Sequence, residues 1–204
     1  YEDAKIDATF VGPMSADIKP TQSHFTVLRD MISNANPETE WYGLLDDDTF
    51  FPSLDALAET LGQYNPKDEL YVGTLSEDFE AVRTFGYMAF GGAGAFLSAP
   101  LAKKLDASMQ TCLGEVAGDQ GDTLIRDCVY RHSKAKLTLV KDLYQQDLMG
   151  DPSGFFESGV RPLNLHHWKS WFHLPVVKMA TAADFCGDCF LQRWRFGNDT
   201  VFSN

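Results

Sequence analysis

A continuous apolar run that ends in three adjacent carboxylates is the feature that most restricts the fold of this chain. Residues 41–45 (WYGLL) lead directly into Asp46, Asp47 and Asp48. An apolar run of this length without alternation predicts a short strand covered on both faces. Three neighbouring carboxylates repel one another, so their position at the end of a buried strand indicates a site.

Predicted helices and strands alternate along the rest of the chain. Helices are predicted to begin near Thr21, Ser53, Ser98 and Gln120, and further strands at 6–11, 70–73 and 136–140. This alternation is typical of an α/β fold with a mostly parallel central sheet. In such a sheet ligands bind at the carboxyl ends of the strands, which is where the aspartate triplet lies.

The composition excludes several classes of partner. The chain has 204 residues, 44% of them hydrophobic, and a net charge of −12. Its length suffices for one globular core. The negative charge opposes binding to nucleic acid or to an anionic membrane surface. No apolar run approaches the roughly 18 residues of a membrane span, and residues 1–10 lack a signal-peptide pattern, so we expect no membrane contact from this segment.

The aspartate triplet has two possible interpretations. A solvated acidic turn, with Asp48 capping the next helix, would need no ligand. A divalent cation explains three carboxylates after a buried strand better, because Mg²⁺ and Mn²⁺ prefer hard oxygen ligands. An EF-hand is excluded because, counting from Asp46, the sixth position is Phe51 rather than Gly and the twelfth is Leu57 rather than Glu.

A glycine-rich run and an isolated aspartate are further candidates. The run Gly91–Gly94 (GGAG) lacks the spacing of a dinucleotide-binding fingerprint or a P-loop. It predicts either a tight turn or a close backbone approach to a ligand. Asp122 falls in the first turn of a predicted helix, where the helix dipole favours the ionised carboxylate by about 0.3–1 kcal/mol. It is either a simple cap or a general base.

The histidines and cysteines leave alternatives open. The adjacent His166 and His167 are either structural or ligands. Four cysteines, at 112, 128, 186 and 189, allow three disulfide pairings, and Cys186 and Cys189 could instead supply half of a zinc site with the histidine pair. The spacing fits a closed zinc site poorly, so disulfides are favoured. Together with the glycosylation sequon at Asn198, the even number of cysteines indicates an oxidising, secretory compartment.

An ordered series of segments carries a resemblance to a known family. The series is WYGLLDDDTFFPSLDALAETLGQYNPKDELYVGTLSED, FGYMAFGGAGAFLSAPLAKKLD, GDTLIRDC, LYQQDLMGD and RPLNLHHW. It resembles the fringe-like branch of the β-1,3-glycosyltransferases, most closely the fringe-related proteins of plants and fungi. The resemblance covers about residues 21–171 and implies a GT-A type nucleotide-sugar-binding fold.

The resemblance implies a role for each candidate residue. The triplet matches the DxD motif, in which Asp46 and Asp48 bind Mn²⁺ (or Mg²⁺) and Asp47 contributes to binding the UDP-sugar donor. His167, or alternatively His166, matches the downstream metal ligand.

The remaining roles concern catalysis and the donor sugar. By the same resemblance, Asp122 is the catalytic base, and Gly91, Gly92 and Ala93 line the donor-sugar pocket. A disulfide between Cys112 and Cys128 is implied as well.

The resemblance also predicts an organisation for the whole protein. Residues 1–175 correspond to the catalytic domain without its usual N-terminal part, and 176–204 to the start of a β-rich appendage. The chain is therefore expected to be incomplete at both ends. We expect a Golgi lumenal protein, anchored as a type II membrane protein from outside this segment, or a secreted one.

The expected activity is that of an inverting, metal-dependent glycosyltransferase. It would transfer a sugar from a UDP-sugar to a hydroxyl of a glycan or glycoprotein acceptor, forming a β-1,3 linkage. The alternatives are a carbohydrate-binding relative without turnover and a metal-dependent phosphohydrolase that uses the same carboxylates to activate water.

Overall fold

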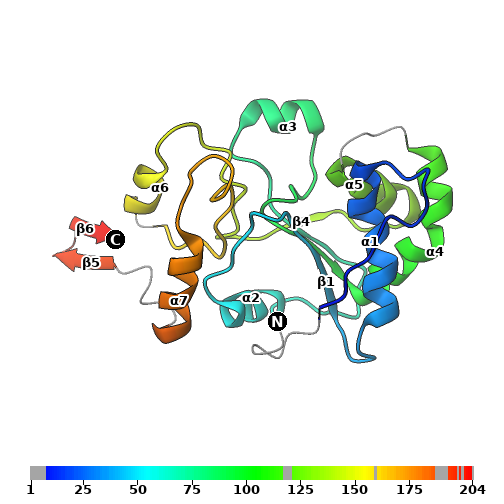
Figure 1. Ribbon diagram of the computed structural model, residues 1–204, viewed down its shortest axis with the longest axis horizontal. Helices are drawn as coiled ribbons and strands as arrows, with labels where there is room; N and C mark the ends of the chain where they lie inside the picture. Colours follow the sequence, from blue (N-terminus) through cyan, green and yellow to red (C-terminus); the bar gives the residue numbers. More distant parts are fainter. Residues whose placement is uncertain are drawn as a thin grey trace.

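The computed structural model describes residues 8–116, 121–158, 160–186, 193–196, 198 and 200–203. The described helices are α1 (Pro20–Asn34), α2 (Leu54–Leu61), α3 (Phe79–Phe85), α4 (Ala99–Glu115), α5 (Gly121–His132), α6 (Ser153–Glu157) and α7 (Val176–Cys186). The described strands are β1 (Trp41–Leu44), β2 (Tyr71–Gly73), β3 (Ala95–Ser98), β4 (Leu137–Leu139), β5 (Arg193–Phe196) and β6 (Thr200–Ser203). Figure 1 shows their arrangement around the central sheet.

The central sheet is mixed, so the prediction of a mostly parallel sheet is wrong. Its strand order is β1-β3-β2-β4, with β3 antiparallel to both β1 and β2, and only β4 parallel to its neighbour β2. The error arose at Ala95–Ser98. These four residues directly follow the glycine-rich run, so the sequence pattern there predicted only a loop and a helix start. The missed strand inserts between β1 and β2 and reverses both pairings.

The antiparallel strand determines which loops meet. Ala95, the first residue of β3, pairs with Leu44, the last residue of β1. Gly73, the last residue of β2, pairs with Leu139, the last residue of β4. The loops after β1, β2 and β4 and the loop before β3 therefore all leave the sheet at one edge.

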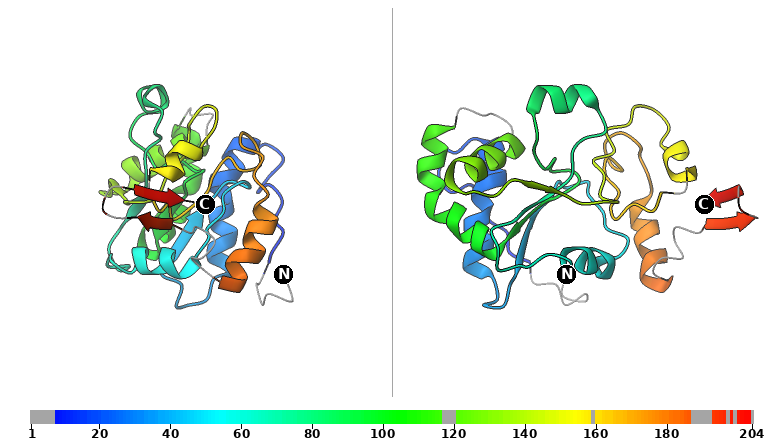
Figure 2. Two further views of the ribbon diagram at one scale, coloured as in Figure 1. Left: turned by 90° about the vertical axis from the view of Figure 1, so that its left-hand side faces the viewer. Right: turned by 180° about the vertical axis from the view of Figure 1, so that it is seen from behind.

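One face of the sheet is covered by α1, α4 and α5, which pack against one another (Figures 1 and 2). Alternate strand residues point toward them, including Tyr42, Leu44 and Leu97. The core on this face also contains Phe25 of α1 and Leu105 of α4, both fully buried. This is the larger of the two cores.

The opposite face has a smaller core. Val72 and Phe96 point to this side and pack with Leu61 of α2. Val140 and Leu143, just after β4, complete it. The segment that follows β4 is therefore packed against the sheet.

Local signals placed several elements correctly. Ser53 caps α2 as predicted, with its hydroxyl accepting a hydrogen bond from the Ala56 N–H at 3.1 Å. The predicted strand at 6–11 is wrong for the part that is described. Residues 8–11 are exposed and outside any strand, and the Phe10 side chain is 90% exposed, because it contacts neither core. Residues 6 and 7 lie outside the described part.

The C-terminal region contains α7 and the antiparallel β5–β6 hairpin. The predicted domain boundary at 175 stays a prediction. Cys189 lies outside the described residues, and so do the pairing of Cys186 with it and the zinc alternative. Asp199 of the sequon is outside them as well. In the described part of the chain, no helix combines the length and apolar character needed to cross a bilayer.

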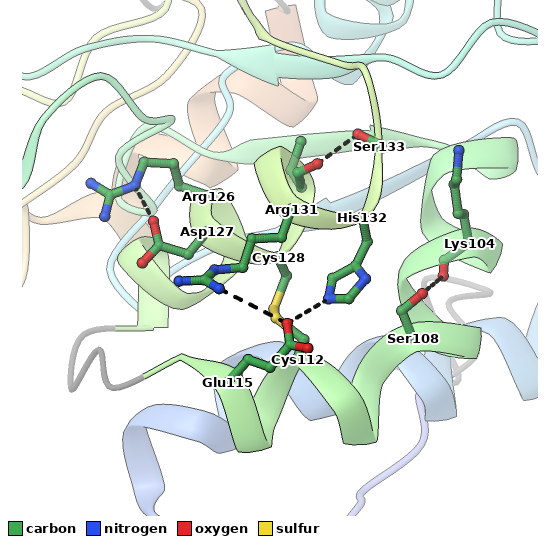
Figure 3. Close-up of a disulfide and its surroundings, with 11 residues drawn as sticks. Lys104, Ser108, Cys112, Glu115, Arg126, Asp127, Cys128, Arg131, His132 and Ser133 are labelled. Atoms are coloured by element: carbon green, nitrogen blue, oxygen red, sulfur yellow. Dashed lines mark hydrogen bonds and ion pairs between the residues drawn. A yellow bond between two sulfur atoms is a disulfide. The ribbon is translucent and has the colours of Figure 1, made fainter.

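A disulfide joins Cys112 of α4 to Cys128 of α5, which confirms the pairing implied by the resemblance (Figure 3). The two Cα atoms are 5.7 Å apart and both cysteines are fully buried. Near the disulfide, Glu115 of α4 forms an ion pair with Arg131 of α5 at 3.9 Å, and its carboxylate lies 3.6 Å from the His132 ring (Figure 3). The disulfide is therefore part of the interface that holds α5 in place.

We expect the double variant Cys112→Ala/Cys128→Ala to lose about 2–4 kcal/mol of unfolding free energy, because the cross-link restricts the unfolded chain. Chemical denaturation measures the loss, and keeping Cys186 and Cys189 intact restricts the change to one pair. Unchanged stability, or free thiols at both positions in non-reducing mass spectrometry of the wild type, would contradict the assignment.

Candidate functional site

A two-bond backbone bridge brings the aspartate triplet and the histidine pair together. The Phe50 N–H donates to the Leu165 carbonyl at 2.8 Å, and the Leu165 N–H donates to the Phe50 carbonyl at 2.7 Å. Asp48 lies two residues before Phe50, and His166 follows Leu165. The bridge therefore places residues from distant parts of the chain side by side.

The other side of the histidine segment is held by the segment after β4. The side-chain amide of Asn164 forms two hydrogen bonds with the backbone of Tyr144. It accepts from the Tyr144 N–H at 2.9 Å and donates to the Tyr144 carbonyl at 2.7 Å. The His166 N–H donates to the Gln146 side-chain oxygen at 2.5 Å. Because both sides of the segment are hydrogen-bonded, the position of His166 is well defined.

His166 is buried and faces two carboxylates of the triplet. Its Nδ1 lies 2.6 Å from the Gln145 carbonyl oxygen, which can only accept a hydrogen bond. In the neutral ring Nδ1 therefore carries the proton and Nε2 presents a lone pair. Nε2 lies 3.2 Å from Asp48 Oδ1 and 3.8 Å from Asp46 Oδ2. A backbone carbonyl that fixes the tautomer of an imidazole is typical of a metal-ligating histidine.

The three aspartates have different surroundings. The Asp48 side chain is 11% exposed, whereas that of Asp46 is 44% exposed. Asp47 points to solvent and pairs with Lys169, whose Nζ lies 2.6 Å from Asp47 Oδ2. The hydrogen bond and charge of Lys169 lower the pKa of Asp47. Only Asp46 and Asp48 thus face His166.

The His167 ring lies against the His166 ring, with centroids 3.7 Å apart, but has other polar partners. Its Nε2 lies 2.9 Å from Asp147 Oδ1 and its Nδ1 lies 3.1 Å from Ser170 Oγ. Its ring stacks on Trp171 with a centroid distance of 3.7 Å and an interplanar angle of 5°. Burial raises the pKa of Asp147, but hydrogen bonds from His167 and Ser76 outweigh it and lower the pKa overall.

The donor set fits a divalent cation. Asp48, His166 and His167 each offer a ligand atom, and these atoms lie within 4.8 Å of one another. A carboxylate oxygen together with imidazole nitrogens is a donor set that suits divalent metal ions. Sequence reasoning favoured His167 over His166 as the ligand; the group contains both histidines, so this choice stays a prediction.

The glycine-rich loop lies in close contact with both functional groups. A Cβ atom at Gly91 would lie 2.6 Å from Asp122 Oδ1, and a Cβ atom at Gly92 would overlap the imidazole ring of His166. Consecutive glycines therefore allow the backbone to pass directly between the aspartate and the histidine. This close approach is a property that only glycine provides.

Hydrogen bonds fix the same loop to its neighbours. The Gly92 carbonyl accepts from the Thr49 hydroxyl at 2.9 Å, and the Ala93 N–H donates to the Gln145 side-chain oxygen at 2.8 Å. All three predicted loop residues, 91–93, are buried. The structure thus shows the loop as the packing surface behind the site, and its predicted contact with a donor sugar stays a prediction.

Asp122 lies in the first turn of α5, at the other side of this loop. Its Oδ2 accepts a hydrogen bond from the Gly91 N–H at 2.8 Å, and its Oδ1 lies 3.9 Å from His24 Nε2. Burial raises the pKa of Asp122, and the Gly91 N–H and the His24 ring oppose this only in part. A carboxylate with a raised pKa is better suited to accept a proton near neutral pH.

Several residues of this arrangement escaped sequence reasoning. They are His24, Gln145, Gln146, Asn164 and Ser170. The two glutamines carried a usable signal, because they are polar residues shortly after the predicted strand at 136–140, near its carboxyl end. The other three could not be found from one sequence, since their roles depend on contacts between distant segments.

Part of the chain matches a protein-family model. Residues 81–180 match the model of DUF604, a family of proteins of unknown function. The match spans just under half of the chain and includes the glycine-rich loop, Asp122 and the histidine pair, but not the aspartate triplet. No curated protein matches the chain.

We expect Gly92→Ala to destabilise the fold by about 1–3 kcal/mol, because its methyl group would overlap the buried His166 ring. The matched control is Gly114→Ala in α4, where a Cβ atom meets nothing within 4 Å. The control should be neutral or up to about 1 kcal/mol more stable. Thermal and chemical denaturation measure both variants, and equal stabilities would contradict the close approach.

Proposed function

We propose that the protein is an inverting, divalent-metal-dependent glycosyltransferase with a GT-A type fold. It transfers a sugar from a UDP-sugar to a hydroxyl of a glycan or glycoprotein, and the resemblance to fringe-like enzymes favours a β-1,3 linkage. The observation that carries the proposal is the position of His166 Nε2. This nitrogen lies beside Asp46 and Asp48, on a ring whose other nitrogen contacts a backbone carbonyl.

In this proposal Asp48, Asp46 and His166 hold Mn²⁺ or Mg²⁺. When bound, the cation neutralises the negative charge that develops on the leaving diphosphate. Asp48 and His166 are buried and their segments are joined by the Phe50–Leu165 bridge, so the two ligands are held in place before a donor binds.

Asp122 is proposed as the base that removes the proton from the acceptor hydroxyl. One of its oxygens is held by the Gly91 N–H, which fixes the orientation of the carboxylate. Asp46 and His166 are near enough to shift the pKa of Asp122 in opposite directions. A base held next to the metal ligands but separated from them by the glycine loop suits a reaction in which donor and acceptor approach from different sides.

The surroundings support the proposed donor and compartment. Lys169 is a cation next to the triplet, paired with the exposed Asp47, and is placed to meet the negative charge of a diphosphate. The Cys112–Cys128 disulfide supports an oxidising compartment, so we propose a Golgi lumenal or secreted protein. The −12 charge gives no support for a nucleic-acid partner.

The first test is incubation of the full-length protein with Mn²⁺ and a panel of UDP-sugars and glycan acceptors. We expect sugar transfer that is lost on chelation, and Asp48→Ala should lose Mn²⁺ affinity and activity together, because an anionic ligand is removed. Release of phosphate without transfer would favour the phosphohydrolase, and binding without turnover would favour the carbohydrate-binding relative. Full activity in Asp48→Ala would reject the metal assignment.

The second test is Asp122→Asn, which keeps the size of the side chain and its ability to accept from Gly91. Turnover should fall by about 10²–10⁴-fold, because an amide cannot accept the proton, while UDP-sugar affinity is retained. In the wild type kcat/KM should rise with pH as Asp122 ionises. Because burial raises this pKa, the fall in activity on lowering the pH should begin at a higher pH than it would for an ordinary aspartate. Near-normal turnover of Asp122→Asn would reject the base.

A further inference from the structure

A chain of side-chain hydrogen bonds runs from Asp48 away from the proposed metal position. Ser170 Oγ donates to Asp48 Oδ2 at 2.7 Å, and Ser170 Oγ also lies 3.1 Å from His167 Nδ1. His167 Nε2 lies 2.9 Å from Asp147 Oδ1. Ser76 Oγ donates to the other oxygen of Asp147 at 2.5 Å. Five side chains from four separate segments thus form one continuous network.

The two carboxylate oxygens of Asp48 have different partners. Oδ2 accepts from Ser170, while Oδ1 lies 3.2 Å from His166 Nε2. An aspartate whose Oδ2 is occupied in this way presents a single oxygen, Oδ1, toward the imidazole. The hydrogen bond from Ser170 therefore sets the rotation of the Asp48 carboxylate.

His167 is the central member of the network. Its Nε2 lies beside Asp147, and its Nδ1 lies beside Ser170 Oγ, the hydroxyl that donates its proton to Asp48. Its ring lies flat against Trp171, and its backbone has φ 57°, in the left-handed region. The His166 and His167 rings lie against each other, with centroids 3.7 Å apart, but their nitrogens have different partners: His166 Nε2 lies beside the carboxylates, and the His167 nitrogens lie beside Asp147 and Ser170.

The far end of the network is attached to the loop after β2. Ser76 Oγ accepts a hydrogen bond from the Asp78 N–H at 2.9 Å, and the Asp78 side chain caps α3 by accepting from the Glu80 N–H at 2.9 Å. Ser76 is buried, at 8% exposure. The network is therefore supported by a capped helix and does not end in solvent.

We infer that His167 is a positioning residue for Asp48, acting through Ser170, and that His166 is the histidine that binds the cation. The inference rests on the proposed metal site and assigns different roles to two histidines that the sequence presents as equivalent. Residues that orient metal ligands through hydrogen bonds typically contribute 10–100-fold to metal affinity.

The test measures Mn²⁺ affinity of the full-length protein by electron paramagnetic resonance, together with the number of imidazole nitrogens bound directly to Mn²⁺ by spin-echo modulation. His167→Asn is the preferred variant, because asparagine tolerates the left-handed backbone at this position. We expect it to bind Mn²⁺ about 10–100-fold more weakly while keeping the directly bound nitrogen. His166→Ala should lose that nitrogen signal.

Ser170→Ala provides a second, milder variant that removes only the hydroxyl between His167 and Asp48. It should weaken Mn²⁺ binding in the same direction and also keep the nitrogen signal. The matched control is Ser108→Ala, whose hydroxyl donates to the Lys104 carbonyl of its own helix at 3.0 Å, and it should bind Mn²⁺ like the wild type. Melting temperatures of all variants are measured in the same buffers.

The outcomes separate this inference from the proposed function. Loss of the nitrogen signal in His167→Asn, or wild-type Mn²⁺ affinity in both His167→Asn and Ser170→Ala, would overturn the positioning role and leave the metal site intact. A wild-type protein that binds no Mn²⁺ would overturn the proposed function and this inference together.

Discussion

The candidate site depends on the backbone bridge between Phe50 and Leu165. These two hydrogen bonds join chain segments that are far apart in sequence. With the bridge in place, Asp48 and His166 extend from adjacent backbones and meet at 3.2 Å. The glutamines after β4 then fix His166 from the other side, so both ligand candidates are held before anything binds.

A second constraint is the space between the aspartate and histidine groups. Gly91 contacts Asp122 and Gly92 contacts His166, so any larger residue would move one of the two groups. Burial raises the pKa of Asp122, while the hydrogen bond from the Gly91 N–H lowers it and holds the carboxylate in its orientation. The close approach of the glycine backbone thus determines both the packing at the two groups and the orientation of the Asp122 carboxylate.

The mixed sheet, which the sequence did not predict, brings the loops of the candidate site together. A parallel β3 would begin at the opposite edge of the sheet, away from the end of β1. Because β3 is antiparallel, Ala95 pairs with Leu44, and the glycine loop before β3 lies beside the aspartates after β1. Four-residue strands next to glycine-rich runs carry too little pattern to be seen, so only the pairing itself reveals the arrangement.

The sequence by itself determined the local features of this protein. Ser53 as a cap, a strand before Asp46 and the helix containing Asp122 follow from residue patterns over a few positions, because capping and apolar periodicity are local effects. The predicted burial of that strand on both faces is wrong, because β1 is an edge strand whose residues alternate between half-buried and buried. The tertiary structure decided which groups meet. Asp48 lies beside His166 Nε2 because the Phe50–Leu165 bridge joins two segments far apart in sequence, and His167 meets Asp147 of a third segment, which no local pattern reveals.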